Sequence, residues 1–379
     1  MVNGRNKYRI KDIFDLSAGG DVDKEHFSAY KTSEHRYPIY SNSLENHGLY
    51  GYTSNPKYSA DSVTITGRGS VGHAEYREDE FDAIIRLLVM KPKSSNVCAQ
   101  FVADYINNCV DFSLESTGVP QLTAPQIMNV ELELPHYDEQ KEVTTVLADV
   151  SSLIDMLGKQ ISKKKAIKQG TMQELLTGKR RLPGFAGEWE KTVLGTVNSF
   201  YTGGTPSKKR EDWWNGDIPW ISSCDLTEDA ITSVNINRYI SKDAVEHSAT
   251  RICPKDAVLV VSRVGVGKVA VAPCELCTSQ DFTTIVPHRH NPHFLAYMLI
   301  PVMKELAMQA QGTSIKGVTV EDIQKIIMPT PTIDEQNQIV DILANMDSEI
   351  EALEQKLEKY RQVKQGMMQQ LLTGKIRLV

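Results

Sequence analysis

Apolar residues recur at every third or fourth position along two long segments of the chain. In the second segment they fall at Ile339, Leu343, Met346, Ile350, Leu353, Leu357 and Tyr360. The matching positions of the first segment hold Val143, Leu147, Val150, Ile154, Leu157 and Ile161. Most other positions are Glu, Lys, Gln or Asp, so the pattern predicts two amphipathic helices with a heptad seam. At 1.5 Å per residue, a helix of about 38 residues is about 57 Å long.

Signals for the start and the end of a helix bound these segments. Thr332 and Glu335 have the spacing of a capping box, which predicts the start of the second helix. Gly178 and Gly374 each follow an LLT triplet. Glycine at this place ends a helix because it tolerates a left-handed backbone.

The two segments are copies of one sequence. Residues 138–182 and 334–378 align without a gap at an offset of 196, and about 21 of the 45 positions are identical. Chance gives about two or three identities, and the offset is far longer than a solenoid repeat, so a whole module is duplicated. Each copy keeps a glycine inside its helix, Gly170 or Gly366. Such a glycine costs about 1 kcal/mol relative to Ala and favours a kink or a close helix contact.

A lone amphipathic helix of this length cannot bury its seam. We therefore expect the two copies to pair with each other; the alternative is that each packs on its own globular domain. The first helix is strongly basic toward its end, which is typical of a solvated face or of a strip that faces a polyanion or an acidic partner. The basic residues are Lys159, Lys163, Lys164, Lys165, Lys168, Lys179, Arg180 and Arg181.

Two globular segments, residues 5–133 and 188–329, each precede one of the helices. Both contain short β-type runs with turn residues, such as SVTITGRGSVGHAEY at 62–76 and AVLVVSRVGVGKVAVA at 257–272. These runs align with a shift of 195, whereas the segments diverge strongly elsewhere. The two copies thus share a frame and differ in surface, which indicates recognition of two different things.

The composition is that of an ordinary globular protein. The 379 residues are 41% hydrophobic and 24% charged, which excludes a wholly disordered or collagen-like chain. The longest apolar stretch, 294–303, is too short to span a bilayer, and we see no signal peptide. Six scattered cysteines predict reduced thiols in a cytoplasmic protein. The net charge of −6 argues mildly against nucleic-acid binding, but local charge can override it.

Catalytic motifs are absent or incomplete. VGVGKVA at 264–270 lacks the first glycine and the hydroxyl of a P-loop, so a hairpin is the better interpretation. NPKY at 55–58 departs from the methyltransferase tetrapeptide NPPY, and the ExK at 139–141 is better explained by helix capping. The lone CxxC at Cys274 and Cys277 favours buried thiols over zinc. We therefore predict a chain without a catalytic centre, metal or cofactor.

Binding features are clearer, and they lie in predicted loops. The segment 202–220 packs basic residues, hydroxyls and tryptophans together, where a polyanion or plain solvent could face the charges. Arg68 and Arg263 lie beside glycine-rich hairpin turns, where arginine binds guanine or phosphate, or forms an ion pair within the domain. The candidate DNA-binding residues are Thr205, Ser207, Lys208, Lys209, Arg210, Arg263, Lys268, Arg68, Ser70 and His73. We expect most of Tyr37, Tyr40, Tyr50 and Tyr52 to be core or rim residues.

The order of module, helix, module and helix resembles the specificity (S) subunit of type I restriction–modification enzymes. The resemblance rests on DEQ and KQGxMQxLLTGK in both repeats, on GGTPSK…GDIPWISSCDL at 203–225 and on GTSIKGVTVEDIQKIIMPTP at 312–331. It covers essentially the whole chain. The first module departs from the pattern, because SAGGDVDKEHFSAYKTSEHRYPIYSNSLENHGLYGY at 17–52 replaces the TPS…GDIPW opening.

This resemblance implies an α+β protein with two mixed α/β target-recognition domains on two long antiparallel helices that form a coiled coil with a pseudo-two-fold repeat. The implied domains are residues 1–133 and 183–331 for recognition, and 134–182 and 332–379 for the helices. Each recognition domain would read one half of an asymmetric bipartite site in double-stranded DNA. The helices would dock two modification (methyltransferase) subunits, and restriction subunits would join. We mark as helix interface residues Leu147, Ile154, Leu157, Ile161, Leu343, Ile350, Leu353 and Leu357.

The resemblance also assigns the chemistry to the partners. S-adenosylmethionine, ATP and Mg²⁺ would belong to those subunits, which would make the complex an adenine-type DNA methyltransferase and ATP-dependent endonuclease. Two rival hypotheses remain open. One is a methyltransferase or nuclease that acts alone, and the other is a coiled-coil protein-interaction adaptor without DNA specificity of its own.

Overall fold

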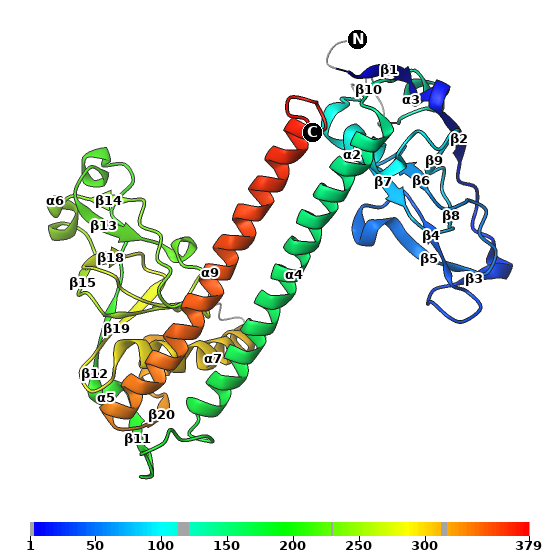
Figure 1. Ribbon diagram of the computed structural model, residues 1–379. Helices are drawn as coiled ribbons and strands as arrows, with labels where there is room; N and C mark the ends of the chain where they lie inside the picture. The colour runs from blue at the N-terminus through cyan, green and yellow to red at the C-terminus, as the bar shows by residue number, and fades with distance from the viewer. Residues whose placement is uncertain (1–3, 113–120, 229, 312–316, 379) are drawn as a thin grey trace. The chain divides into compact units, whose positions relative to one another are not determined.

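The computed structural model describes residues 4–112, 121–228, 230–311 and 317–378. The chain forms two compact units, which we describe separately (Figure 1). Unit 1 consists of Met1–Lys159 and Gln355–Val379, and unit 2 consists of Gln160–Glu354. Each unit holds one globular module and one part of each long helix.

Unit 1 is built from three small sheets and short helices. Before the first long helix its elements are β1 (Asn6–Arg9), α1 (Ile10–Ile13), β2 (Phe14–Ala18), η1 (Lys24–His26), β3 (Phe27–Ser28), β4 (Tyr37–Tyr40), η2 (Glu45–Gly48), β5 (Leu49–Thr53), β6 (Ser62–Ile65), β7 (Ala74–Arg77), β8 (Asp82–Ala83), β9 (Leu88–Pro92), α2 (Ala99–Cys109), α3 (Ala124–Met128) and β10 (Glu131–Leu134). The sheets have the orders β2-β9-β6-β7, β3-β5-β4-β8 and β1-β10.

Unit 2 repeats this plan. Its elements are β11 (Glu190–Val193), α5 (Leu194–Val197), β12 (Asn198–Thr202), η3 (Glu211–Trp214), β13 (Ile218–Ile221), η4 (Ser223–Asp225), β14 (Tyr239–Ile240), α6 (Lys242–Glu246), β15 (Ile252–Cys253), β16 (Val258–Val261), β17 (Val269–Val271), β18 (Leu276–Thr278), β19 (Phe282–Pro287), α7 (Pro292–Gln311), α8 (Val320–Gln324) and β20 (Ile327–Thr330). The sheets have the orders β12-β19-β16-β17, β14-β13-β18-β15 and β11-β20.

The shared frame that the sequence predicts is thus present in both units. The sheet β12-β19-β16-β17 corresponds strand for strand to β2-β9-β6-β7, and all neighbours in both are antiparallel. Each second sheet contains one parallel pair, β4 with β8 or β13 with β18. The edge strands β3 and β15 have no such counterpart, so the modules differ at the rim of this sheet.

The predicted hairpins are confirmed at both aligned runs. β6 pairs with β7 and β16 with β17, so the VGVGKVA segment is a hairpin turn. A residue before each first strand, Asp61 or Asp256, has a left-handed backbone with φ of 56° or 64°. Asp is among the few residue types that adopt this conformation at modest cost. This requirement explains why the alignment of the modules keeps an aspartate there.

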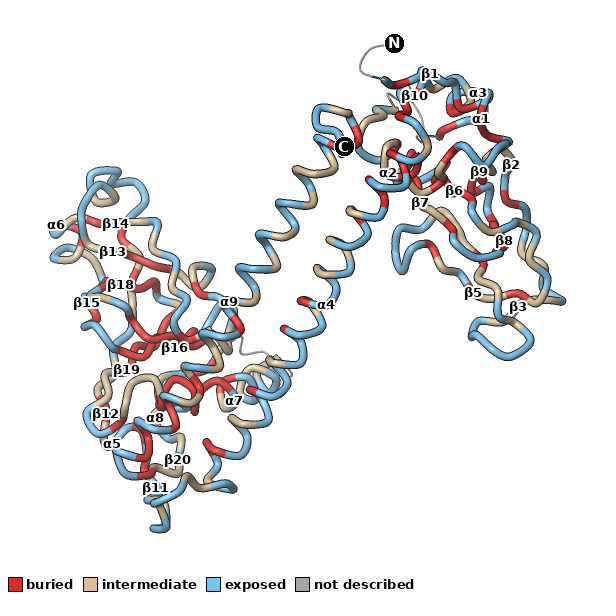
Figure 2. The backbone as a smooth tube through the Cα atoms, in the orientation of Figure 1, coloured by how far each residue is buried: buried red, intermediate tan, exposed pale blue. Residues whose placement is uncertain are grey.

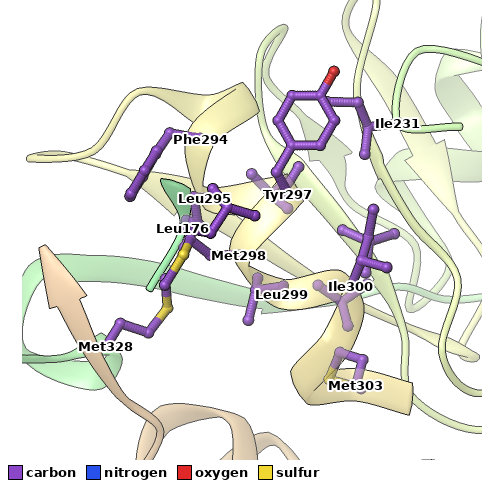
Figure 3. Close-up of a cluster of buried hydrophobic side chains, with 14 of the residues drawn as sticks. Leu176, Ile231, Phe294, Leu295, Tyr297, Met298, Leu299, Ile300, Met303 and Met328 are labelled. Carbon is purple, nitrogen blue, oxygen red and sulfur yellow. The ribbon is translucent and has the colours of Figure 1, made fainter. Parts of the chain in front are cut away.

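The core of unit 2 lies between its first sheet and α7. Val258 and Val260 of β16 face α7, while the alternate residues Leu259 and Val261 face a second cluster. All four are buried, as the continuous apolar run of the strand requires. Figure 3 shows the α7 side of this core, which Leu176 joins from just after the first long helix.

The two long helices are α4 (Tyr137–Leu175) and α9 (Ile333–Leu371), each of 39 residues. In unit 2, Lys165 Nζ lies 2.7 Å from the Glu354 carboxylate, and Lys168 pairs with Asp347, so the helices run antiparallel. The acidic partner of the basic stretch of α4 therefore includes α9 itself.

The predicted pairing of the helices is confirmed, and their ends also belong to the domain cores. In unit 1, Val143 and Leu147 of α4 share a core with Leu371 and Leu372 and with α2. Figure 2 shows buried and half-buried positions alternating with exposed ones along both helices. Of the expected seam residues, those fully buried are Leu147, Leu157, Ile161, Leu343 and Ile350, and those half-buried are Ile154, Leu353 and Leu357.

The helix-ending glycines are confirmed, whereas the interior glycines behave differently from the expectation. Gly178 and Gly374 have φ of 69° and 72°, and the Gly178 amide donates to the Leu175 carbonyl at 3.3 Å. A Cβ added to Gly170 or Gly366 would meet no described atom within 4 Å. No close contact of the chain with itself therefore explains the interior glycines.

Of the two hydrogen bonds in the capping box predicted at the start of α9, only the one to the Thr332 side chain forms. The Glu335 amide donates to Thr332 Oγ1 at 3.5 Å. The Glu335 carboxylate turns away and accepts two hydrogen bonds of 2.8 Å from Arg181, with a third of 3.1 Å from Trp189 Nε1. A bidentate arginine is a stronger partner for a carboxylate than a single backbone amide.

We call the pair of Arg181 and Glu335 a clasp, because an arginine after one long helix holds a glutamate at the start of the other. Unit 1 has the same clasp with the two helices exchanged. Arg377, which follows α9, donates to the Glu139 carboxylate near the start of α4 at 3.2 and 2.6 Å. The next residue of each DEQ triplet caps the module helix, because the Gln140 side chain accepts from the amide of Cys98 at 3.0 Å. Gln336 accepts in the same way from Asn291 at 2.8 Å. The identical residues of the two repeats thus join each helix to a module.

Within the described part of the chain, no helix is both long enough and apolar enough to cross a membrane. The most apolar segment forms α7, which continues through Pro301. Its apolar residues fill the core of unit 2, where Phe294, Leu295 and Leu299 are fully buried.

Candidate nucleic-acid interface

The loop between β12 and β13 carries two unpaired lysines. Lys208 and Lys209 are exposed. Within the described ranges, neither ammonium forms an ion pair or a hydrogen bond. Both positive charges are therefore available to an external polyanion, as the sequence predicts.

Arg210, the third basic residue of the run, is already paired. Its guanidinium donates to the Asp212 carboxylate at 2.9 and 2.6 Å, lies 3.6 Å from Asp243, and covers the ring of Trp213 at 4.8 Å. These contacts raise the pKa of Arg210 and lower that of Asp212. Arg210 therefore fastens the loop to α6, and we remove it from the free charges of the interface.

Trp213 of η3 and Trp220 of β13 hold this loop in place. Trp213 Nε1 donates to Asp243 at 2.6 Å, and Trp220 Nε1 donates to the Gly204 carbonyl at 2.9 Å. A Cβ on Gly204 would lie 2.5 Å from the backbone of residues 249–250, so only glycine fits there. The GGTP…GDIPW motif thus builds a loop that presents lysines.

The two hydroxyl residues expected at the interface differ in availability. Thr205 is half-buried and its hydroxyl donates to the Gln280 side chain. Ser207 is exposed, and its hydroxyl and carbonyl accept from the Lys209 amide and the Trp214 indole at 3.4 and 3.3 Å. Ser207 keeps a donor for an external acceptor, whereas Thr205 serves mainly to shape the loop.

The hairpin arginines are free of partners in the described residues. Arg68 and Arg263 are exposed, and neither forms an ion pair or a side-chain hydrogen bond there. Ser70 and His73, on the same turn as Arg68, are also exposed. The alternative of an ion pair inside each domain is therefore not what the structure has, and these turns present polar side chains to solvent.

Lys268, in contrast, points inward. Its ammonium is half-buried and donates to the carbonyl oxygens of Ser223 and Leu226 at 3.2 and 2.9 Å. These bonds tie the β16–β17 hairpin to the loop after β13. Lys268 therefore has a role inside the module, and its contact with DNA stays a prediction.

A hollow of about 610 Å³ lies on the second sheet of unit 1. Lys31, Arg36, Tyr37, Tyr40 and Tyr52 are among the residues that line it. The three tyrosines are half-buried, as expected for residues at a rim. Aromatic rings beside cations suit the faces and edges of nucleic-acid bases.

Sequence reasoning missed the arginine that supports this hollow. Arg77 is buried, donates to Thr64 Oγ1 at 3.0 Å and to Glu75 at 3.1 Å, and lies 3.5 Å above the ring of Tyr40. Burial lowers the pKa of Arg77, and the Glu75 carboxylate opposes that shift. Arg77 also holds the His47 carbonyl at 3.0 Å. Only its position in an amphipathic strand could have indicated a burial of this kind.

Unit 2 has an analogous stack with different chemistry. Arg238 lies 4.7 Å above the ring of Trp220, pairs with Asp225, and donates to Ser222 Oγ at 2.8 Å. Both modules therefore brace the second sheet with an arginine on an aromatic ring. The side chains around the two stacks differ, so the two surfaces differ as the sequence predicts.

Metal chemistry finds no support in the described residues. Among them no group of three or more His, Cys, Asp or Glu side chains is placed to hold a metal ion. Cys277 is buried in a core, and burial raises the pKa of its thiol to about 11. Cys274, the other member of the CxxC, is half-buried and its thiol is free.

The sequence matches the family described as type I restriction modification DNA specificity domain over residues 4–166 and 186–360. It is 29% identical over 241 residues to the Escherichia coli type I restriction enzyme EcoR124I/EcoR124II specificity subunit, which covers 59% of this chain and 58% of the relative. It is 25% identical over 266 residues to the putative MjaX specificity subunit of Methanocaldococcus jannaschii, covering 67% and 61%. The chain thus spans about three-fifths of these relatives.

Two solved structures share the fold. The S subunit of a type I restriction–modification system from M. genitalium has a TM-score of 0.66 at 12% identity, covering 98% of this chain and 96% of that one. A chain from a study of complex assembly and conformational transition in the type I system has a TM-score of 0.59 at 16% identity, covering 97% of both. At these identities the likeness concerns the fold alone.

Proposed function

Because the chain belongs to the family of type I restriction modification DNA specificity domains, we propose that it selects the DNA sequence for a type I restriction–modification complex. Each module reads one half of a bipartite DNA target, and the base pairs between the two half-sites are not read. The proposal follows most directly from one observation. Two modules whose first sheets have the same strand order present different exposed loops, which is what an asymmetric, two-part target requires.

The contacts follow from the exposed, unpaired groups. Lys208 and Lys209 neutralise phosphates of the half-site read by unit 2, a contact that gives affinity without sequence preference. Arg68 and Arg263 have the free guanidinium edges that bind guanine bidentately in the major groove. Ser70, His73 and Ser207 add donors and acceptors of shorter reach. The hollow on unit 1 adds tyrosine rings beside Lys31 and Arg36.

The chain acts without chemistry of its own and docks the subunits that perform it. We assign two methyltransferase subunits to the long helices and expect restriction subunits to join them. S-adenosylmethionine, ATP and Mg²⁺ supply methyl transfer and cleavage in those partners. The net charge of −6 disfavours tight DNA binding by this chain alone. The partners therefore complete the positive clamp.

An exchange of modules tests the proposal. Replacing residues 188–329 by the matching segment of another family member should change one half of the methylated sequence and leave the other half and the spacer unchanged. The measurement is methylome sequencing of cells that express the chain with its methyltransferase partner. Replacing residues 5–133 is the matched control and should change only the opposite half.

Three outcomes separate the hypotheses. A change in both halves would contradict the assignment of one reader to each module. No change after either exchange would favour an adaptor without DNA specificity. Methyl transfer by the purified chain alone would revive the hypothesis of an independent enzyme.

A further inference from the structure

The segment between β8 and β9 of unit 1 contains a turn whose residues disfavour the backbone conformation they adopt. Ile85 and Arg86 have φ of 55° and 58°, which lies in the left-handed region. A β-branched residue rarely adopts this conformation, because its side chain crowds the backbone. Among the described residues, Ile85 is the only isoleucine, valine or threonine with a positive φ. Its side chain is also 55% exposed, so burial does little to offset the strain.

Neighbouring groups of the module impose this conformation. The Ile85 amide donates to the Gly20 carbonyl at 2.9 Å. The Arg86 amide donates to the Gly19 carbonyl at 3.0 Å. The Asn42 side chain holds the turn as well, because its Nδ2 donates to the Ile85 carbonyl at 2.7 Å. Strain that the surrounding structure fixes in this way indicates a role other than stabilising the chain.

Asn42 also joins this turn to the hairpin turn of Arg68. Its Oδ1 accepts from the Gly67 amide at 2.9 Å, and a Cβ on Gly67 would lie 3.7 Å from the Arg86 carbonyl oxygen. The two turns are therefore neighbours at the surface. Arg68 and Arg86 are exposed, and within the described ranges neither guanidinium forms an ion pair or a hydrogen bond. A strained apolar side chain thus lies beside two free positive charges.

The corresponding turn of unit 2, between β18 and β19, has different chemistry. It consists of Ser279, Gln280 and Asp281, and none of the three has a left-handed backbone. The Ser279 hydroxyl donates to the Asp281 carboxylate at 3.0 Å. The Gln280 side chain accepts from the Thr205 hydroxyl. This turn uses its polar side chains inside the module and carries no apolar one, so the two modules differ here in kind.

We propose that the Ile85 side chain is a wedge that partly unstacks one base step in the DNA half-site read by unit 1, while Arg86 neutralises a neighbouring phosphate. Proteins that kink DNA insert an apolar side chain between two base pairs and hold the backbone with cations. A partner protein fits less well, because one exposed isoleucine beside two free arginines is far smaller than a protein interface of about 800 Å² per partner. This inference rests on the proposed function and adds that one half-site is read partly through its deformability.

A wedge predicts which DNA sequence is favoured at its place. Pyrimidine–purine steps unstack most easily, so we expect one such step in the half-site read by unit 1. Replacing it by a purine–purine step should weaken binding by the wild-type complex by about ten-fold. The same replacement should weaken binding by less than about two-fold when Ile85 is changed to asparagine, because no unstacking then takes place.

Unstacking can be measured directly with 2-aminopurine, whose fluorescence rises when it leaves the base stack. The duplex carries the target found by methylome sequencing, with the probe at one adenine position at a time. The methylated positions are left out, because a methyltransferase extrudes its target base by itself. The full chain with its methyltransferase subunit should raise the fluorescence at one position in the half-site of unit 1 and at none in the other half. Ile85→Asn and Ile85→Gly should abolish this rise and weaken binding by about ten-fold, whereas Ile85→Leu should keep both.

The same variants separate DNA binding from stability. Asparagine and glycine adopt a left-handed backbone more readily than isoleucine, so the melting temperature of the chain should not fall while the DNA affinity does. Leu44→Ser is the matched control, because Leu44 is 48% exposed on the loop that follows Asn42 and has an ordinary φ of −88°. It should leave the fluorescence and the affinity within about two-fold of wild type.

The outcomes distinguish the wedge from its alternatives. Unchanged fluorescence and affinity in both Ile85→Asn and Ile85→Gly would overturn the wedge. Loss of the methyltransferase subunit from these variants, seen by native mass spectrometry, would also overturn it and assign Ile85 to a protein contact. A wild-type complex that binds its target specifically without any rise in fluorescence would overturn the wedge alone. A wild-type complex without sequence preference would instead overturn the proposed function, and this inference with it.

Discussion

Glu139 and Glu335 are buried carboxylates, and each is held by the arginine that follows the other long helix. The side chain of Glu335 is 1% exposed and that of its partner Arg181 is 26% exposed. Removing one member of such a pair leaves a buried charge without compensation, which costs more than the pair itself contributes. The clasp explains why DEQ and the final arginine recur in both repeats.

Arg181→Ala should therefore destabilise unit 2 by about 2–4 kcal/mol, because Glu335 keeps only the Trp189 indole. All four tryptophans of the chain lie in unit 2, so tryptophan fluorescence during urea unfolding reports on this unit. Arg180→Ala is the control, since Arg180 forms an exposed pair with Glu174 at 3.1 Å. It should cost at most about 1 kcal/mol. Equal decreases in the free energy of unfolding for the two variants would show that the clasp stabilises unit 2 no more than an exposed ion pair does.

A carboxylate lies near a lysine of a long helix in both units, but on different elements. In unit 1 it is Asp104 of the module helix α2, near Lys364 of α9. In unit 2 it is Asp347 of α9, which accepts from Tyr297 of α7 at 2.6 Å and pairs with Lys168 of α4. Burial raises the pKa of Asp104 to about 6, and the charge of Lys364 only partly opposes this.

Stability should depend on this group in a defined pH range. The pKa of Asp104 in the folded chain exceeds the ordinary value of 3.8, so folding favours the protonated form. The stability of unit 1 should then fall as the pH rises from about 4 to about 6 and stay level above. Asp104→Asn should remove this dependence and stabilise unit 1 at pH 7 by about 1–3 kcal/mol. Hydrogen exchange of the amides of α2 at pH 5 and 7 measures the effect.

The exposed Asp155 of α4 provides the comparison. Asp155→Asn should leave the exchange of α2 unchanged at both pH values. An Asp104→Asn variant with the same pH dependence as wild type would show that another group is responsible.

At the scale of single elements, Gly170 inside α4 and Gly178 just after its end have opposite requirements. Gly178 has a positive φ of 69°, and an added Cβ would lie 3.5 Å from the Trp189 ring. Gly170 lies inside the helix, five residues before its end, with open space around it. The same substitution should therefore change stability in opposite directions at the two positions.

We expect Gly178→Ala to destabilise unit 2 by about 1 kcal/mol, because alanine disfavours the left-handed backbone. Gly170→Ala should stabilise it by up to about 1 kcal/mol, because alanine is the better helix former. Thermal unfolding followed by tryptophan fluorescence gives both shifts. Destabilisation by Gly170→Ala would mean that this glycine has a role inside the chain after all.

At the scale of the whole molecule, the long helices connect two modules and on the proposed function set the spacer of the target. Inserting four residues after Lys159 and four after Glu354 lengthens both helices at the boundary of the units by about 6 Å. The contacts inside each unit are kept. The unread spacer should become one or two base pairs longer, at about 3.4 Å per pair. Methylome sequencing reads the new spacer directly.

An insertion after Lys159 alone is the informative comparison. It shifts one helix against the other by about 6 Å, so the clasps Arg181–Glu335 and Arg377–Glu139 cannot both form. We expect loss of activity from this variant in place of a new spacer. Retained activity with the original spacer in the paired insertion would show that the helices do not set the distance.

Several features of the fold could be predicted from the sequence because they depend on neighbours in the chain. The heptad period predicts α4 and α9, the LLTG ends predict their left-handed caps, and short β-type runs with turn residues predict the two central hairpins. The internal repeat predicts that one frame occurs twice. The inferences about helices, caps and hairpins compare residues whose spacing in the sequence fixes their spacing in an element.

The availability of each charge could not be predicted in this way. Lys209 and Arg210 are adjacent and alike in the sequence, yet only Arg210 is paired, with Asp212 at 2.6 Å and with Asp243, which α6 brings to 3.6 Å. Lys268 is bound by carbonyl groups more than forty residues away. A list of basic residues therefore overestimates the interface until the fold removes the paired ones.

The sequence by itself determined the duplicated architecture, the two helices and the difference between the two modules. Periodicity within a segment indicates which face of an element is buried, and comparison of two segments shows which parts are duplicated. The tertiary structure alone decided which polar groups are used inside the chain. Arg181 and Glu335 are 154 residues apart, and burial of the glutamate gives that pair its importance. Hydrogen bonds and ion pairs join whatever the fold brings within about 3 Å, so the polar residues left free for contacts outside the chain are known only after folding has assigned the rest.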